Sequence, residues 1–136
     1  MALLGKEVRM SRLVNPKSNK MMAITVDHAI SRGIAPMTGI QDIQGAIDKI
    51  VAGRPDAMTM TGPIAERCLE KHAGKVSLLC KISSYSPVSP TQDAVFGTVD
   101  SAIALGADAV SMGCMTLGDF QNEQFEAIGK VAQECR

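Results

Sequence analysis

The chain has 136 residues, of which 46% are hydrophobic, and its 14 basic and 14 acidic side chains give a formal net charge of zero. This length fits a single domain over residues 1–136 with a core of its own, and the balanced charge argues against a nucleic-acid partner. With one Tyr, three Phe and no Trp, the chain has too few aromatic residues for a platform that stacks single-stranded nucleic acid.

Four cysteines, Cys68, Cys80, Cys114 and Cys135, form no Cys-x-x-Cys pair and no Cys/His spacing typical of zinc. We therefore predict reduced thiols, no metal and a cytoplasmic location. No apolar stretch is long enough to span a bilayer, and the N-terminus lacks a signal-peptide pattern, so no membrane partner is expected. Neither a dinucleotide-binding fingerprint nor a P-loop occurs, and no cofactor is predicted.

The first predicted element is a short helix over residues 2–14, which Asn15-Pro16 breaks. Residues 21–26 form a continuous apolar run, which is typical of a short strand covered on both faces. Asp27-His28 follows this strand directly. Because parallel α/β folds keep their chemistry at the carboxyl ends of their strands, this pair is the first candidate for a functional site.

The next helix is predicted to begin in a capping box at Thr38-Gly39-Ile40-Gln41 and to carry one apolar stripe. Gly53 is expected to end it in the left-handed conformation. A second strand over 56–60 leads into a helix that begins at Thr61-Gly62-Pro63, with proline at its first position, and runs to about Lys71.

A third strand is predicted over 76–82, followed by a loop over 83–91 that is too polar to lie in the core. A helix capped near Thr98 runs to Leu105, and a fourth strand covers 108–112. The last helix is expected to run from about Asp119 to the end of the chain.

Residues 46–60 and 102–112 repeat one pattern, in which a helix, a glycine stop and a turn with aspartate precede a buried strand. Such units build a parallel sheet with right-handed crossovers, so the predicted fold class is α/β with about four βα units and a short N-terminal helix. Two unrelated αβ turns would show the same pattern. A flavodoxin-like domain also alternates strands and helices, but this chain lacks a phosphate or flavin loop after its first strand.

All four predicted strands end in polar or small residues, and in a βα barrel these ends converge on one face. A carboxylate there can transfer a proton, and a lysine can neutralise a phosphate or carbonyl oxygen. The residues in question are Asp27-His28, Thr61-Gly62, Lys81 with Ser83-Ser84, and Gly113-Cys114.

Each candidate also has a plainer structural role. Asp27 suits a turn or helix cap, His28 a packed and hydrogen-bonded imidazole, and Lys81 a strand-end lysine whose ammonium reaches water. If it were desolvated in a barrel mouth, Lys81 would instead be a candidate Schiff-base nucleophile. His72 is predicted to be solvated at a helix end, and Cys114 to be an unreactive thiol.

The chain resembles the archaeal-type class I fructose-bisphosphate aldolases, and it is similar to the related aminodideoxyheptulosonate synthases and autoinducer-2-processing thiolase. The resemblance covers nearly the whole chain, from Gly5 to Cys135. It rests on Asp27-His28, Asp56-Ala57-Met58, Leu78-Leu79-Cys80-Lys81, Val99-Asp100-Ser101-Ala102-Ile103 and Leu105-Gly106-Ala107-Asp108-Ala109-Val110.

The resemblance implies a TIM barrel, a phosphorylated sugar or keto substrate, and carbon–carbon bond chemistry through a lysine imine. Asp27 matches the family's acidic catalytic residue at the end of the first strand. His28 matches the histidine beside it, and Lys81 matches a lysine of the aldolase branch that does not form the imine. We expect His28 and Lys81 to bind substrate.

The chain departs from the family at Ala29, where the family usually has glycine, and the family's imine-forming lysine lies on a sixth strand. We therefore expect the N-terminal half of a (β/α)8 barrel. Four strands do not close a barrel, and open edge strands invite pairing. The expected partner is a second copy or a complementary half-barrel chain. The alternative to a lyase or transferase is a non-catalytic half-barrel with a structural or regulatory role.

Overall fold

A four-stranded parallel sheet forms the centre of the computed structural model, which describes residues 4–33 and 37–136. The strand order is β1-β2-β3-β6, and every neighbouring pair is parallel. The bounds are β1 (Ala23–Thr25), β2 (Ala57–Thr61), β3 (Ser77–Lys81) and β6 (Ala109–Ser111).

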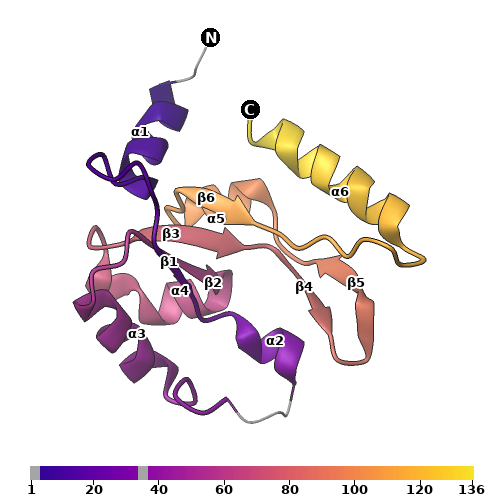
Figure 1. Cartoon of the computed structure of the whole chain (residues 1–136), viewed down its shortest axis with the longest axis horizontal. Helices are drawn as coiled ribbons and strands as arrows, with labels where there is room; N and C mark the ends of the chain where they lie inside the picture. Colours follow the sequence, from indigo (N-terminus) through magenta and orange to yellow (C-terminus); the bar gives the residue numbers. More distant parts are fainter. Residues whose placement is uncertain (1–3, 34–36) are drawn as a thin grey trace.

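Helices follow each of these strands, so the predicted α/β class with four βα units is confirmed (Figure 1). No helix over the described residues is both long and apolar enough to cross a membrane. The helices are α1 (Leu4–Leu13), α2 (His28–Arg32), α3 (Ile43–Ala52), α4 (Gly62–Cys68), the 3-10 helix η1 (Glu70–His72), α5 (Val99–Ala104) and α6 (Gln121–Glu134). Residues 2 and 3 of the predicted first helix lie outside the described residues.

The core lies between one face of the sheet and helices α3, α4 and α5. In-register pairs such as Met58–Leu78 and Met60–Cys80 point their side chains to this face, because residues opposite each other in neighbouring strands share a face. Ile47 of α3 is fully buried against them. Burial of one such side chain contributes about 1.5–3 kcal/mol to stability, so this layer fixes the positions of the strand ends.

The segment after β3 is a β-hairpin and not the predicted polar loop. β4 (Ser83–Ser86) pairs antiparallel with β5 (Ser89–Val95), and Ser83 is completely buried. The prediction was wrong because the polar side chains of this segment find partners inside the protein. Figure 1 shows the hairpin between α2 and α6, and it packs against both helices.

The first strand is shorter and more exposed than predicted. β1 covers Ala23–Thr25 only, and Met21 and Met22 before it are 46% and 52% exposed. The prediction of a strand covered on both faces is therefore wrong. The physical reason is that Met21 and Met22 precede the strand, and no residue of β1 belongs to the buried core formed with the helices.

The start of α3 also differs from the sequence prediction. Asp42 is the N-cap residue, and its carboxylate accepts a hydrogen bond from the Gly45 amide at 3.0 Å. The predicted capping box at residues 38–41 lies before the helix. Gly53 is right-handed (φ −73°), and Arg54 adopts the left-handed conformation (φ 56°) instead.

Other local predictions are confirmed. Pro63 stands in the first turn of α4. Thr98 and Ser101 form a reciprocal capping box at the start of α5, with distances of 3.0 and 3.1 Å. Gly106 is left-handed (φ 76°) after that helix. These signals depend only on residues within one turn, so they are visible in the sequence.

Candidate active site

One row of side chains crosses the face of the sheet opposite the core helices, at the carboxyl end of the strands. Thr61 of β2, Lys81 of β3 and Ser111 of β6 are in register with one another. Thr25 lies one pleat earlier on β1, opposite Thr59. The hydroxyl of Thr25 donates a hydrogen bond to Asp27, so both side chains lie on this face. We call the residues Asp27, Thr61, Lys81 and Ser111 the polar row.

Asp27 occupies the N-cap position of α2 but makes no capping hydrogen bond (φ −91°, ψ 8°). Its half-buried carboxylate accepts from Thr25 instead. The role of helix cap, one of the plainer alternatives, is therefore not what the structure shows. A carboxylate held by a strand residue at the mouth can accept a proton from a bound molecule or return one to it.

His28 is the first residue of α2 and is half-buried. Its Nδ1 atom is buried and has no hydrogen-bond partner within the described parts of the chain. The plainer alternative was a packed and hydrogen-bonded imidazole. The ring is packed, but its Nδ1 atom is not hydrogen-bonded to the described residues. An unpaired buried ring nitrogen carries a desolvation penalty of about 1–3 kcal/mol.

Lys81 ends β3 and is half-buried. Among the described residues, no carboxylate oxygen lies within 4.0 Å of its ammonium. β1 and β3 flank β2, so Asp27 and Lys81 come from strands about 10 Å apart and lie on the same face of the sheet. Within the part of the chain that the structure describes, no ion pair joins these two predicted residues.

A second group at this end of the sheet was missed by the sequence prediction. Asp93 of β5 is only 8% exposed and accepts a hydrogen bond from Ser83 Oγ at 3.3 Å. Ser83 Oγ in turn accepts from the Gly113 amide at 2.8 Å. The sequence holds no local signal for this group, because the predicted polar loop ended at residue 91 and Gly113 lies 20 residues beyond Asp93.

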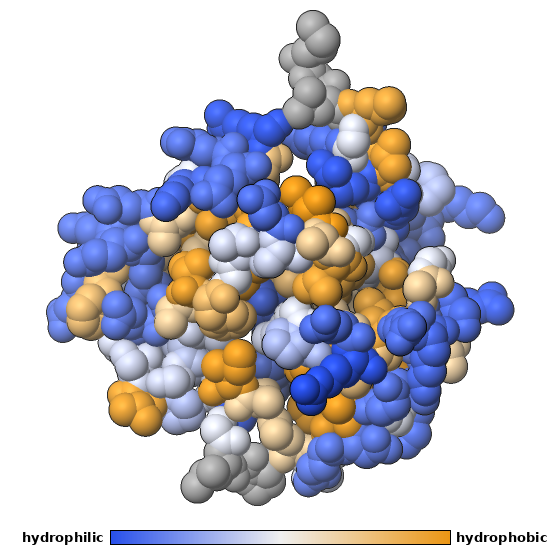
Figure 2. Space-filling view, turned by 180° about the vertical axis from the view of Figure 1, so that it is seen from behind, coloured by the Kyte–Doolittle hydropathy of each residue, from blue (hydrophilic) through white to orange (hydrophobic). Residues whose placement is uncertain are grey.

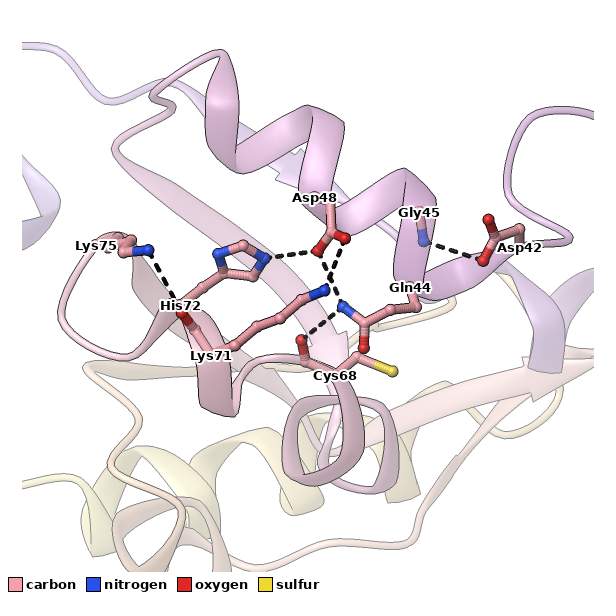
Figure 3. A network of polar contacts seen from close by, with 8 residues as sticks. All are labelled: Asp42, Gln44, Gly45, Asp48, Cys68, Lys71, His72 and Lys75. Atoms are coloured by element: carbon pink, nitrogen blue, oxygen red, sulfur yellow. Dashed lines mark hydrogen bonds and ion pairs between the residues drawn. The ribbon is translucent and has the colours of Figure 1, made fainter.

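His72 is not the solvated helix-end residue that the sequence predicted. Its side chain is 12% exposed, and its Nε2 atom lies 2.7 Å from Oδ1 of Asp48 on α3. Lys71 Nζ lies 2.7 Å from the other oxygen of Asp48. Figure 3 shows these two side chains and Gln44 converging on Asp48. The hydrogen bonds from Lys71 and His72 hold the pKa of Asp48 well below its usual range.

This cluster joins α3 to the segment after α4, on the helix-covered side of the sheet. We therefore assign it to stability and not to the candidate active site. Cys80 also lies on that side in the core, and burial raises the pKa of its thiol. Cys114, which follows β6, is half-buried and is a free thiol like the other three cysteines.

Comparison with known proteins gives the same fold and a family. The family model for DeoC/LacD family aldolases matches residues 21–136. The 2-amino-3,7-dideoxy-D-threo-hept-6-ulosonate synthase of Halobacterium salinarum is 28% identical over 133 residues, which are 96% of this chain and 48% of that protein. Synthase 1 of the same name from Archaeoglobus fulgidus is 28% identical over 135 residues, 98% of this chain and 50% of that protein.

Solved structures match with high structural similarity at low sequence identity. An archaeal fructose-1,6-bisphosphate aldolase, with its catalytic Lys covalently bound to the carbinolamine intermediate, superposes with a TM-score of 0.72 at 21% identity. That match covers 96% of this chain and 52% of the aldolase. The fructose-bisphosphate aldolase from Slackia heliotrinireducens gives a TM-score of 0.73 at 11% identity, over 96% and 46% of the two chains.

The chain thus spans about half the length of the relatives that it matches. Its four βα units correspond to about half of the TIM barrel of its structural neighbours, which confirms the predicted half-barrel architecture. The match of the family model to residues 21–136 also confirms the predicted resemblance, and it shows that this chain belongs to the DeoC/LacD family of aldolases.

Proposed function

We propose that the chain supplies the first-half residues of a class I aldolase-type lyase or transferase. The enzyme would break or form a carbon–carbon bond of a phosphorylated sugar or keto substrate through a lysine imine. The observation that carries the proposal is the polar row, in which Asp27 and Lys81 lie on one face of the sheet in a chain that belongs to an aldolase family. The resemblance assigns the imine to a lysine on a sixth strand, beyond these four βα units.

Asp27 is proposed to transfer the proton. Cleavage of an aldol requires removal of a proton from the hydroxyl group beside the broken bond, and the imine accepts the electron pair that is released. The Asp27 carboxylate has the right chemistry because it caps no helix and is oriented by the hydroxyl of Thr25. Proton transfer by a positioned side chain typically contributes about 10²–10⁴-fold to the rate.

Lys81 and His28 are proposed to bind the substrate. The Lys81 ammonium has no carboxylate partner among the described residues, so its charge is available to a phosphate or a carbonyl oxygen. His28 stands next to Asp27 at the start of α2 and is half-buried at the same strand end. No metal or cofactor is needed for this scheme, since the imine supplies the electron sink.

Binding of dihydroxyacetone phosphate, a small keto phosphate, tests the proposal. In ¹H–¹⁵N NMR titrations we expect the amide signals of Asp27, His28 and Lys81 to shift. Lys81→Met should weaken binding at least tenfold. Lys130→Met, on the exposed face of α6, is the matched control and should bind like the wild type. Equal binding by the Lys81 variant would refute the assignment.

Borohydride trapping with the same keto phosphate tests the assignment of the imine. We expect no lysine adduct within these 136 residues. An adduct on Lys81 would instead make Lys81 the nucleophile of a Schiff base and would contradict the scheme above. Peptide mass spectrometry identifies the modified lysine.

A second candidate function is a non-catalytic half-barrel that pairs with a second copy or with a complementary half-barrel chain. Within the described residues, β1 and β6 each have one unpaired edge. A groove of about 880 Å³ lies beside β6. Its lining combines apolar residues such as Val99, Ile103 and Val110 with the charged residues Lys6, Arg9, Asp108, Glu134 and Arg136. Figure 2 shows apolar residues gathered in the middle of the rear face, ringed by hydrophilic side chains. Surfaces of this kind mark contact sites.

Light scattering after size exclusion tests the pairing. A mass of twice 14.4 kDa is expected for a pair of identical chains. A folded monomer at micromolar concentration would contradict self-pairing. Pairing without any binding of the keto phosphate would favour the non-catalytic function over the enzymatic one. We propose a cytoplasmic location on the basis of the four free thiols.

A further inference from the structure

The β4–β5 hairpin is joined to the segment after β6 by a chain of hydrogen bonds that runs through buried groups. The Gly113 amide donates to Ser83 Oγ at 2.8 Å, and that hydroxyl donates to Asp93 Oδ2 at 3.3 Å. Ser83 is completely buried, and Asp93 is 8% exposed. A buried carboxylate is costly without hydrogen bonds, so the bond from Ser83 stabilises Asp93 in its buried position. The same hydroxyl holds the Gly113 amide, so the hairpin and the segment after β6 are fixed to each other.

The carboxylate of Asp93 also occupies the space that a side chain at position 113 would need. A Cβ atom built on Gly113 would lie 1.8 Å from Asp93 Oδ2 and 2.8 Å from its Cγ atom. The backbone of Gly113 is not in the left-handed conformation, so the contact with Asp93 is what requires glycine here. The two residues are therefore coupled by packing as well as by the hydroxyl of Ser83.

A second connection lies on the same side of the hairpin. Gln124 of α6 donates from Nε2 to the Thr91 carbonyl at 3.2 Å, and its Oε1 accepts from the Met115 amide at 2.7 Å. Its side chain is buried. The hairpin is thus attached twice to the chain that leaves β6, once through Asp93 and once through Gln124.

The opposite side of the hairpin supports the segment that carries Asp27 and His28. Helix α2 packs against β4, as Figure 1 shows. At the tip of the hairpin, Pro87 Cγ lies 3.1 Å from the point where a Cβ of Gly33 would stand. Gly33 has φ 58° and follows the last residue of α2. A displacement of the hairpin would therefore move α2, and with it His28, the first residue of that helix.

We propose that Asp93 is a positioning residue of the candidate active site, which acts through the β4–β5 hairpin to hold Asp27 and His28 in place relative to Lys81. The expected effect of Asp93 on substrate binding rests on the proposed function. Its expected effect on the positions of Asp27 and His28 does not. Asp93 acts as a hydrogen-bond acceptor of the right size, so asparagine, which keeps an acceptor oxygen, is the conservative replacement.

The test compares Asp93→Ala with Asp93→Asn in the full chain without substrate. In the alanine variant, we expect the ¹H–¹⁵N signals of residues 27–32 and the His28 ring signals to shift, whereas those of Met58 and Leu78 in the core stay in place. In the asparagine variant, the His28 signals should remain at the wild-type position. Asp100→Ala, on the exposed side of α5, is the matched control. Unchanged His28 signals in Asp93→Ala would overturn the proposal.

A double variant separates this coupling from a general loss of stability. Gly113→Ala should lower the melting temperature by several degrees, and Asp93→Ala combined with it should melt above the single Gly113 variant. Gly129→Ala, where a Cβ has no atom within 4 Å, is the glycine control and should not lower the melting temperature. If the losses in melting temperature of the two single variants add up in the double variant, Asp93 and Gly113 are not coupled by packing.

Titration with dihydroxyacetone phosphate distinguishes this inference from the proposed function. Weaker binding by Asp93→Ala, at least threefold, with wild-type binding by Asp93→Asn would support both. If the wild type binds no keto phosphate but the His28 signals still move in Asp93→Ala, the proposed function fails and the positioning role holds. If the wild type binds and the alanine variant binds equally well with unmoved signals, only the positioning role fails.

Discussion

Asp27 is oriented by Thr25, a residue of the strand before it, and not by the helix that it precedes. This matters because a carboxylate that capped α2 would have its acceptor lone pairs committed to backbone amides. Held from one side only, the carboxylate keeps acceptor capacity for a substrate.

Replacement of Asp27 by asparagine removes the proposed base while keeping its size. The rate is measured on a barrel completed by the half that carries the proposed imine-forming lysine. There we expect aldol cleavage of a phosphorylated keto sugar to fall at least about 100-fold, since that is the usual contribution of a positioned proton-transfer group. Cleavage is monitored by the release of the aldehyde product. Asp100→Asn on the exposed side of α5 is the control. An Asp27 variant as fast as the wild type would exclude this role.

Asp48 gives the fold a dependence on acidic pH. Hydrogen bonds from Lys71 and His72 hold its pKa well below the ordinary value of 3.8. A carboxylate whose pKa is lowered in the folded state stabilises the fold above its ordinary pKa, and that contribution is lost as the pH falls below about 4. Since the side chain is 40% exposed, solvent and salt screen the effect and keep it small.

The measurement is a series of thermal melts between about pH 6 and pH 2 at low salt. The melting temperature of the wild type should fall more steeply below about pH 4 than that of Asp48→Asn. The difference between the two proteins should shrink at high ionic strength. Parallel curves for the two would show that the cluster in Figure 3 contributes nothing to acid stability.

Capping residues decide where the helices of this chain begin. α3 begins at Ile43 because Asp42 accepts from the Gly45 amide. Asp42→Ala should lower the free energy of unfolding by about 1 kcal/mol, the usual cost of a lost N-cap. Urea denaturation followed by circular dichroism measures it. Thr38→Ala is the matched control, because residue 38 lies before the helix, and an equal loss there would restore the capping box predicted from the sequence.

How much of each element could be predicted depends on how local its cause is. Local causes made three features predictable: the second strand, predicted over 56–60 and found at Ala57–Thr61, the proline start of α4, and the cap of α5 at Thr98. The buried pair of Ser83 and Asp93 depends on Gly113, which lies 30 and 20 residues away from them, and His72 depends on Asp48, 24 residues away. Contacts between residues so far apart leave no pattern in the local sequence. The β4–β5 hairpin, whose first residues were predicted to be a solvated loop, therefore proved to hold buried side chains.

The whole molecule depends on one layer of side chains between sheet and helices. Ile47 lies in the middle of this layer and is fully buried, whereas Ile103 of α5 is 64% exposed. Ile47→Ala should cost about 2–5 kcal/mol, because it removes buried methylene groups and leaves a cavity. Ile103→Ala, the same chemical change at the surface, should cost less than about 0.5 kcal/mol.

Urea denaturation of the two isoleucine variants measures this difference. Similar losses in both would mean that Ile103 is covered in solution, as it would be in the proposed pair of half-barrels. The result would then have to agree with the mass from light scattering. The Ile47→Ala variant thus measures the stability of the core, and the Ile103→Ala variant reports whether α5 is covered by a partner.

The contact between Asp93 and Gly113 has a consequence for the evolution of the family. A mutation that adds any side chain at position 113 is tolerated only after position 93 has become smaller, so the two positions can change only in a fixed order. Among homologous sequences, substitutions at these sites should therefore appear together. A lineage that keeps aspartate at 93 should keep glycine at 113, however far the rest of the hairpin has diverged.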